Sequence, residues 1–294
     1  MAEGNFVVVD ITDGGQTIVA EVDYASAPMT IYEGAIYMIQ AQPYQVETLD
    51  WEGRKAFVRR TTADYYTDAI DYIRLKILED FERSGQGSGE AANGEVHLVR
   101  RIAGYKKIRY YTHENIGFGD IHLPDQEMHT TAVWWQLGAG VLEANFPSRQ
   151  QALDGFLGAA YAMHHVAALR AMCEPGDLGR AVGDGDAEWF ATVGAAGRGQ
   201  IKHFDGSEAD PEAQGRFVPA LFLYDNYPGG VGLSAPLFDQ RGAVVTQARE
   251  LVAACDCAHG CPACVGPILA SDAERGFSPK GAAARVLELL GGSA

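Results

Sequence analysis

Four of the five cysteines lie within ten positions of one another, and this cluster limits what the surrounding chain can fold into more than any other feature. The run CDCAHGCPAC has the spacing C-x-C-x3-C-x2-C, with thiols at Cys255, Cys257, Cys261 and Cys264. Four thiolates on one short loop can surround a single ion tetrahedrally, and a complete set of four leaves no coordination position for a catalytic water. Gly260, just before the second pair, and Pro262, within it, are turn residues. The sequence therefore predicts one structural zinc ion per chain.

Two other uses of the cluster stay open, an iron–sulfur cluster and a pair of disulfides. We expect a soluble, cytoplasmic protein, because the first residues lack a basic segment followed by an apolar one and no stretch approaches the roughly 20 apolar residues that span a bilayer. Thiols stay reduced in that compartment, and a C-x-C pair is poorly placed for an internal disulfide. His259, inside the loop, is expected to lie outside the set of metal ligands.

The charge of the chain restricts its contacts with nucleic acid. Lys and Arg number 23 and Asp and Glu 39, so the formal net charge is −16, which excludes a histone-like protein that coats DNA. The stretch 96–113 differs, because it holds five basic residues and three tyrosines without an acidic residue. Basic groups can bind phosphates and tyrosines can stack on bases, which makes candidate DNA-binding residues of Arg100, Arg101, Lys106, Lys107 and Arg109. A solvated hairpin that carries Lys and Arg for solubility is an equally good interpretation.

The first part of the chain has the composition of β-strands. Short runs rich in Val, Ile, Tyr and Phe are separated by turn residues, and they cover 5–11, 16–22, 35–40, 44–49 and 55–60. Such regular spacing predicts a β-rich, barrel-like domain over residues 1–138. Further strands are expected over 71–81, 95–111 and 119–135. Because the segment 84–94, SGQGSGEAANG, lacks large apolar residues, it is predicted to be a flexible loop tip.

After Gly138 the hydrophobic period changes to that of helices. Ser148 and Gln151 form a capping box, and apolar residues follow at helical spacing, so a helix is expected over about 149–172. A short strand over 218–224, a helix over 243–254 and a helix from Ser278-Pro279 to Gly291 are also predicted. The sequence thus predicts an α+β chain in which a mainly helical, four-cysteine zinc-binding domain covers 139–294.

A glycine turn follows the predicted strand over 218–224. The run YDNYPGGVGLS places Gly229, Gly230 and Gly232 between a strand and a helix, where backbone N–H groups can hold an anion such as phosphate. The plainer interpretation is a tight turn that lets the helix pack close to the strand. The chain contains no G-x-x-x-x-G-K-[ST] sequence, so we expect no independent ATPase site.

Two further sets of residues are expected to be structural. His122, Glu127 and His129 could bind a metal on spacing alone, but Pro124 interrupts the element that would orient them. Cys173 lies near two histidines, but it follows an apolar helix where a buried, inert thiol is usual.

Together these motifs resemble a known family. The runs YDNYPGGVGLS and CDCAHGCPACVGP, with a helix between them, resemble the MrfA-associated zinc-binding domain at the C-terminal end of the MrfA (YprA-type) DNA-repair helicases. NFVVVD, the segment EVDYASAPMTIYEGAIYMIQAQPYQVETLDWEGRKAFVRRTTADYYTDA and IGFGDIHLPDQEMHTTAVWW look like the part that precedes that domain. The resemblance covers nearly the whole chain, and it implies that the four clustered cysteines are the zinc ligands.

The resemblance implies a non-catalytic region of a helicase that uses ATP to translocate 3′ to 5′ along single-stranded DNA in damage repair, and that guides or grips this DNA. The two motor domains with their nucleotide-binding motifs have no counterpart here, so we expect a part of a longer helicase. The alternative is a stand-alone scaffold that docks on a separate helicase motor, such as the partner subunit of a phage-defence system. A zinc hydrolase is disfavoured by the complete set of four thiolates.

Overall fold

The computed structural model describes residues 4–112, 114–186, 189–192, 201–202, 208–209, 218–266 and 278–291. The chain divides into two compact units, unit 1 with Met1–Asp71 and Arg101–Asp125, and unit 2 with Tyr72–Arg100 and Gln126–Ala294. This division differs from the expected boundary at Gly138. Two long strands, β6 (Tyr65–Gln86) and β7 (Gly89–Arg109), each pass from one unit into the other, so neither unit is one continuous stretch of chain.

Unit 1 is built on an open five-stranded sheet in the order β2-β1-β5-β4-β3. β1 and β5 are parallel and the other neighbours antiparallel. The strand bounds agree closely with the predicted runs: Phe6–Asp10 (β1), Thr17–Val22 (β2), Ile36–Ile39 (β3), Gln42–Asp50 (β4) and Lys55–Arg60 (β5). The short helix α1 (Ala27–Thr30) and β8 (Asn115–Asp120) complete the unit, whose core includes Phe6, Tyr32 and Tyr105.

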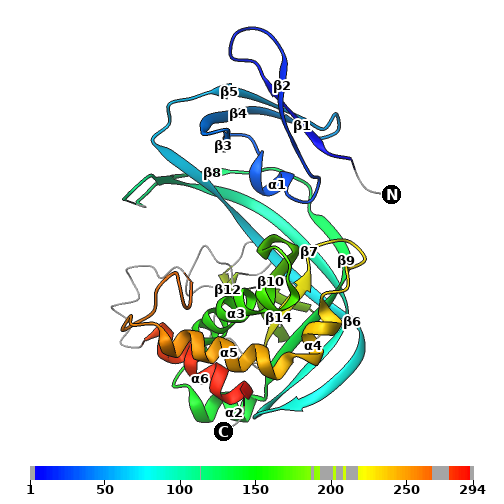
Figure 1. Ribbon diagram of the computed structural model, residues 1–294, viewed down its shortest axis with the longest axis vertical. Helices are drawn as coiled ribbons and strands as arrows, with labels where there is room; N and C mark the ends of the chain where they lie inside the picture. The colour runs from blue at the N-terminus through cyan, green and yellow to red at the C-terminus, as the bar shows by residue number, and fades with distance from the viewer. Residues whose placement is uncertain are drawn as a thin grey trace. The chain divides into compact units, whose positions relative to one another are not determined.

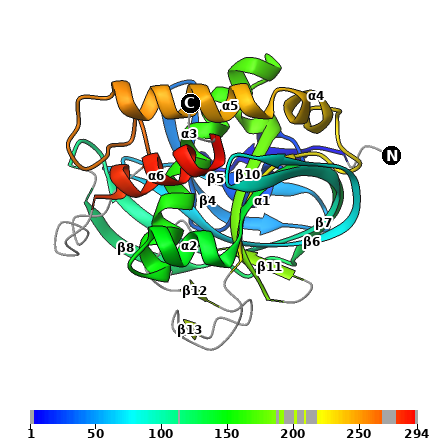
Figure 2. The same cartoon turned by 90° about the horizontal axis from the view of Figure 1, so that it is seen from below.

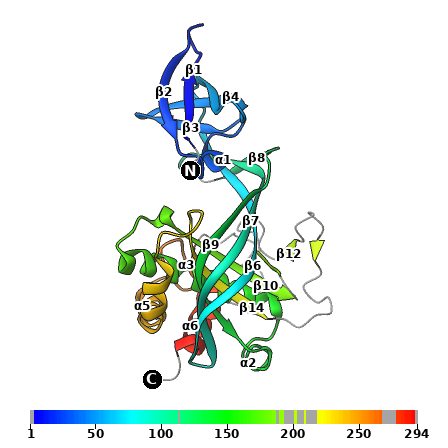
Figure 3. The ribbon, with the colours of Figure 1, turned by 90° about the vertical axis from the view of Figure 1, so that its right-hand side faces the viewer.

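Unit 2 contains a sheet that closes into a barrel-like ring. The strands follow the order β6-β11-β10-β14-β9-β7, and β6 also pairs with β7, which brings the two ends of the order together. The remaining strands of the ring are Gln126–Leu137 (β9), Leu178–Asp186 (β10), Trp189–Thr192 (β11) and Pro219–Asp225 (β14). Figure 3 shows β6, β7 and β9 as long curved strands. The predicted α+β class with a barrel-like sheet is confirmed, and strands on both sides of Gly138 form the ring.

Alternation along the strands gives the ring two apolar faces. One buried cluster contains Trp134 and Phe222, whose rings lie 5.9 Å apart on paired positions of β9 and β14, together with Leu75, Leu98 and Tyr224. The other face of the same strands, with Trp135, Leu221 and Leu223, packs against helices. Burial on both faces explains why β14 is buried throughout.

The helices form a layer over this second face. They are Ala139–Asn145 (α2), Arg149–Ala171 (α3), Ser234–Asp239 (α4), Arg241–Ala254 (α5) and Pro279–Gly291 (α6), with a short 3-10 turn η1 (Pro175–Asp177) after α3. α3 contacts both α5 and α6, which also contact each other (Figures 1 and 2). Half of the predicted capping box of α3 is confirmed, because the Ser148 hydroxyl accepts a hydrogen bond from the Gln151 N–H at 3.2 Å. The reciprocal half does not form, since the buried Gln151 side-chain oxygen has no hydrogen-bond partner among the described residues. The two-residue strands β12 (Ile201–Lys202) and β13 (Glu208–Ala209) pair with each other.

The prediction of a flexible loop over 84–94 is wrong. β6 and β7 meet there in a tight turn, and Ala91, Ala92 and Asn93 are buried. The turn is held by neighbouring elements, since the Ser88 N–H donates to the Leu289 carbonyl of α6 and Arg241 donates to the Ser84 hydroxyl. The small residues reflect close packing, because a side chain at Gly94 would collide with the backbone of β6.

Within the part of the chain that the structure describes, no helix combines the length and the apolar character needed to cross a bilayer.

Candidate metal centre

The four clustered cysteines, which we call the cysteine knuckle (255–264), converge in unit 2. Cys255 ends α5, and the loop that follows brings the other three thiols back towards it. The Sγ atom of Cys255 lies 3.5 Å from the Sγ atoms of both Cys257 and Cys261. Cys264 completes the group, with its Sγ 3.5 Å from Cys257 and 3.7 Å from Cys261. All four sulfur atoms lie within 4.8 Å of one another.

These separations fit a tetrahedral zinc site. A zinc–sulfur bond of about 2.3 Å places the corners of a tetrahedron about 3.8 Å apart, close to the observed distances. A disulfide needs sulfur atoms about 2.05 Å apart, and all four cysteines are free thiols. The predicted gathering of Cys255, Cys257, Cys261 and Cys264 therefore fits one ion held by four sulfurs. Such a site supplies structural stability and leaves no position for water.

The loop backbone carries the second pair of thiols into place. Gly260 has φ +119°, a conformation that a residue with a side chain adopts only under strain. The N–H groups of Cys264 and Val265 both donate to the Cys261 carbonyl at 3.1 Å, which closes a helical turn around the last two ligands. A backbone hydrogen bond from Ala263 lowers the pKa of Cys261 to about 7, and burial raises the pKa of Cys264 to about 12.

The first turn of α6 clamps the cysteine knuckle. The Lys280 ammonium donates to the carbonyl oxygens of Cys255 and Cys257, and the Lys280 N–H donates to the His259 carbonyl at 2.9 Å. Ser278 caps α6 by accepting from the Gly281 N–H at 3.2 Å. Sequence patterns predict the cap but not this use of Lys280, because the lysine and the loop are separated by a stretch of chain without a shared motif.

Helix α3 supports the other side of the cysteine knuckle. A Cβ atom at Gly158 would lie 2.8 Å from the Ala283 Cβ of α6 and 3.1 Å from the Val265 Cβ, which directly follows the last ligand. Both distances are closer than packed carbon atoms approach, so only glycine permits this contact. The helix layer and the cysteine knuckle therefore share one packed core.

The glycine turn holds an anion that belongs to the chain itself. The Asp225 carboxylate is fully buried and accepts hydrogen bonds from the N–H groups of Val231, Gly232 and Leu233 at 2.7, 2.8 and 3.1 Å. The Ser234 hydroxyl donates to its second oxygen at 2.7 Å. Of the three predicted glycines only Gly232 donates to this carboxylate, because the Gly229 and Gly230 N–H groups donate to the carbonyls of His129 and Tyr227. The N–H groups that converge here bind a side chain of the chain itself, which fits the tight-turn interpretation. Sequence reasoning missed Asp225, although its position just before the turn was the available signal.

Of the five candidate DNA-binding residues, Arg100 belongs to unit 2 and the other four to unit 1. Arg100 donates to the Tyr224 hydroxyl and to Asn226, both at 3.1 Å. Arg101 makes two 2.8 Å hydrogen bonds to Asp125, so both arginines have structural partners.

The other three basic residues lie on β7 near its end. Arg109 lies 3.6 Å from Asp64 and 3.8 Å from Glu114, and the Lys107 ammonium lies 5.6 Å from the centre of the Tyr65 ring. Burial raises the pKa of Asp68, and the charge of Lys106 opposes this rise. Acidic residues outside 96–113 thus balance part of the charge of a stretch that lacks them in the sequence.

His129, His164 and Cys173 have the contacts of residues that stabilise the fold. His129 lies 3.4 Å from Glu95, and among the described residues only the cysteine knuckle brings three or more potential metal ligands together. His164 is buried and its Nε2 lies 2.7 Å from the Leu178 carbonyl, while burial lowers its pKa. Burial also raises the pKa of the Cys173 thiol, as expected for an inert cysteine.

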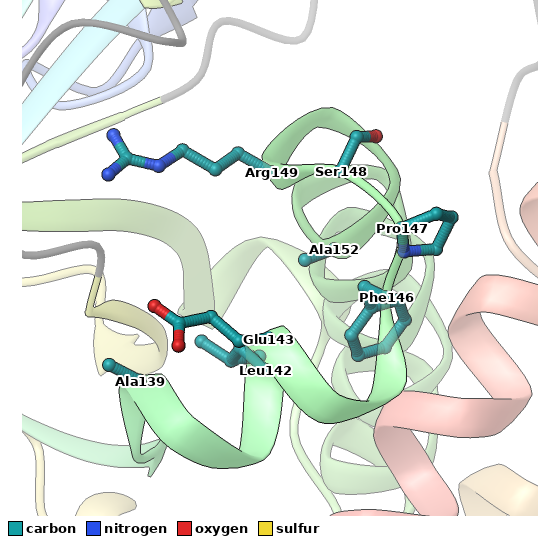
Figure 4. A pocket seen from close by; sticks show the side chains of 8 residues that line it. All are labelled: Ala139, Leu142, Glu143, Phe146, Pro147, Ser148, Arg149 and Ala152. Carbon is teal, nitrogen blue, oxygen red and sulfur yellow. The ribbon is translucent and has the colours of Figure 1, made fainter.

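A pocket of about 280 Å³ lies between α2 and the start of α3. Figure 4 shows a mixed lining, with the apolar side chains of Leu142 and Phe146 and the polar side chains of Glu143, Ser148 and Arg149. Its size is just below the range of about 300–1,000 Å³ that is typical of small-molecule sites.

Comparison with known proteins supplies the context for this geometry. Residues 159–265 match the family described as the MrfA Zn-binding domain, and the match includes the glycine turn and all four clustered cysteines. This chain carries the MrfA Zn-binding domain. The presence of a zinc-binding domain agrees with the prediction of a zinc cofactor and with the sulfur geometry.

The similarity extends beyond that domain. The chain is 32% identical to the ATP-dependent helicase YprA of Bacillus subtilis over 90% of its length, and 24% identical to the ATP-dependent helicase HRQ1 of Saccharomyces cerevisiae over 99%. These matches cover 32% and 26% of the two helicases, so the chain spans about a third or less of the length of these relatives. The DUF1998 helicase MrfA bound to DNA superposes on 98% of the chain with a TM-score of 0.59 and 30% identity, over 34% of MrfA.

Proposed function

We propose that this chain acts as the non-catalytic, DNA-gripping region of a 3′ to 5′ ATP-dependent DNA-repair helicase, structured by one zinc ion held by Cys255, Cys257, Cys261 and Cys264. The observation that carries the proposal is the 32% identity to the helicase YprA along 90% of the chain. The similarity to a DNA-bound helicase structure supports a DNA partner. The motor is supplied by domains of the same helicase or by a separate chain.

Zinc has a structural task in this proposal. Four thiolates fill a tetrahedral site, so the ion joins the end of α5 to the loop without taking part in a reaction. The first turn of α6 is attached to that loop through Lys280. Metal binding of this kind is coupled to folding, because the ligands come together only in the folded loop. The helices thereby keep a fixed arrangement over the barrel-like sheet of unit 2.

DNA binding is tested by titrating a fluorescent single-stranded oligonucleotide with the chain at several salt concentrations. We expect an affinity that falls as salt rises, because each phosphate contact releases counterions and adds roughly one unit to the salt slope. Replacing Lys106, Lys107 and Arg109 together by Ala should reduce both affinity and slope. Arg59→Ala is the matched control, since Arg59 is also exposed in unit 1 and bridged to Glu47.

The alternative function is a protein scaffold that docks on a helicase motor without touching DNA. It predicts no oligonucleotide binding at any salt concentration and a stable complex with the motor. Absence of oligonucleotide binding at every salt concentration would reject the DNA-gripping proposal. An unchanged slope in the triple variant would reject Lys106, Lys107 and Arg109 as phosphate contacts. The chain alone should also hydrolyse no ATP, because it lacks the glycine-rich loop with lysine that holds the phosphates in P-loop enzymes.

A further inference from the structure

Two large aromatic side chains are exposed on the β7–β8 hairpin of unit 1. Tyr111, the second residue after β7, is 97% exposed, and Phe118 on β8 is 66% exposed. Single exposed apolar residues are common on proteins, but two such rings on one short hairpin need a cause. Their place in the strands shows that neither ring belongs to the core of the unit.

The pairing of β7 with β8 directs Phe118 outward. Phe118 is opposite Lys106, and Tyr105, the next residue along β7, packs into the core of unit 1 against Gly34 and Gly119. Because neighbouring side chains on a strand alternate between faces, Lys106 and Phe118 share the face away from that core. The exposed ring therefore has a cation directly across the strand pair.

Tyr111 has a strained backbone conformation that is not offset by burial of its side chain. Its φ of +67° lies in the left-handed region, where a residue with a bulky side chain is strained by roughly 1–2 kcal/mol. Glycine or asparagine is the usual residue at such a position. A strained conformation that presents a fully exposed ring indicates selection for something other than packing.

A chain of aromatic rings leads from β6 to Tyr111. The Tyr110 and Tyr111 rings lie 6.5 Å apart, and the half-buried Tyr110 ring lies 5.7 Å from that of Tyr66 on β6. Lys107 lies over the Tyr65 ring on the same strand. The hairpin thus combines two exposed rings with an ordered base of aromatic and cationic side chains.

We infer that Tyr111 and Phe118 are stacking residues for the bases of single-stranded DNA. This inference rests on the proposed function and assigns to these two rings the part that the five basic residues were expected to carry. Aromatic faces stack on unpaired bases without regard to sequence, and nearby cations attract the backbone. Asp64, Glu114 and Asp68 offset much of the charge of Arg109 and Lys106. Stacking is therefore expected to contribute more than phosphate contacts.

The test compares Tyr111→Ala and Phe118→Ala with the wild-type chain in oligonucleotide titrations. Each alanine variant should weaken binding of single-stranded DNA roughly fivefold or more, with an unchanged salt slope, because stacking releases no counterions. Tyr111→Phe should bind like wild type, since it keeps the aromatic face. Ile18→Ala is the matched control, because Ile18 is 67% exposed on β2 of the same unit. An oligonucleotide with 2-aminopurine should also show fluorescence quenching that Tyr111→Ala reduces.

The outcomes separate this inference from the proposed function. If both alanine variants bind and quench like wild type while the Lys106, Lys107 and Arg109 variant binds more weakly, the stacking role is wrong and the DNA-gripping function stands. If the wild-type chain binds no single-stranded DNA at low salt, both are wrong. If Tyr111→Phe loses as much affinity as Tyr111→Ala, the hydroxyl and not the ring face makes the contact, and stacking at Tyr111 is rejected.

Discussion

The cysteine knuckle and the β7–β8 hairpin orient their characteristic side chains in opposite directions, the thiols inward and the aromatic rings outward. At the knuckle, four thiols point at one another, and α3 and α6 pack closely around the loop. At the hairpin, Tyr111 and Phe118 point into solvent, and Tyr111 has a strained backbone. We therefore expect the inward-pointing thiols to contribute to stability. The outward-pointing rings, one of them on a strained backbone, should contribute to binding. Substitutions that affect only one of these two properties test this distinction.

The largest effect is expected for Cys261→Ser. Losing one of four ligands should release the zinc and lower the free energy of unfolding by on the order of 4 kcal/mol, because metal binding and folding of the loop are coupled. Zinc content and thermal unfolding of the same preparation measure both consequences. Cys173→Ser is the control, since Cys173 is a free thiol outside the cysteine knuckle. This variant should keep one zinc ion per chain. Unchanged thermal stability of Cys261→Ser would show that the knuckle is peripheral to the fold.

Removal of the Asp225 carboxylate should have the next largest effect. Asp225→Ala leaves three N–H groups and the Ser234 hydroxyl without their buried acceptor, so we expect a loss of about 3 kcal/mol in chemical denaturation. Asp239→Ala, at an exposed position of α4, should change stability by less than about 0.5 kcal/mol. Similar stability of the two variants would contradict the role given to Asp225. Tight phosphate binding by Asp225→Ala would then support the anion site expected from the sequence.

A smaller loss is predicted where α3 meets α6. Gly158→Ala adds a methyl group 2.8 Å from the Ala283 Cβ, and overpacking of this kind costs about 1–3 kcal/mol. The same change at Gly140 in α2 meets nothing within 4 Å and should be neutral or stabilise the chain by up to about 1 kcal/mol. Equal stabilities, measured by denaturant titration, would mean that the helices are not as closely packed around the cysteine knuckle as described.

The smallest effect on stability is expected at the hairpin. Tyr111→Gly relieves a left-handed conformation, so the free energy of unfolding should stay the same or rise by up to about 1 kcal/mol, although single-stranded DNA binding falls. Thermal unfolding and oligonucleotide titration of one preparation give both values. A clear loss of stability would show that the Tyr111 ring stabilises the fold, which contradicts this prediction.

Local patterns predicted the elements of this fold better than their assembly. The spacing of turn residues located all five strands of the open sheet, and Ser148 with Gln151 located the start of α3. The ring in unit 2 could not be found this way, because β6 meets β11 only after more than a hundred residues of chain have folded between them. The run SGQGSGEAANG misled the prediction, since small residues required by close strand packing have the composition of a loop.

The candidate site shows the same limit. The C-x-C-x3-C-x2-C spacing was enough to predict that four thiols converge, because the ligands lie on one short loop. Lys280 was missed, since it binds backbone carbonyls of the cysteine knuckle, which carry no sequence signal. Asp225 was missed although its position just before the glycine turn was an available signal. The basic stretch 96–113 was free of acidic residues in the sequence but not in space, because Asp64 and Asp125 reach it from other segments.

Native mass spectrometry of the intact chain, combined with alkylation of accessible thiols, shows whether four thiolates enclose one zinc ion. We predict a mass that corresponds to one zinc ion per chain, and modification of Cys173 alone until the metal is removed with a chelator. After chelation, Cys255, Cys257, Cys261 and Cys264 should all react. A chain that carries no zinc or two zinc ions, or whose clustered cysteines are alkylated while zinc stays bound, would contradict a closed four-thiolate site.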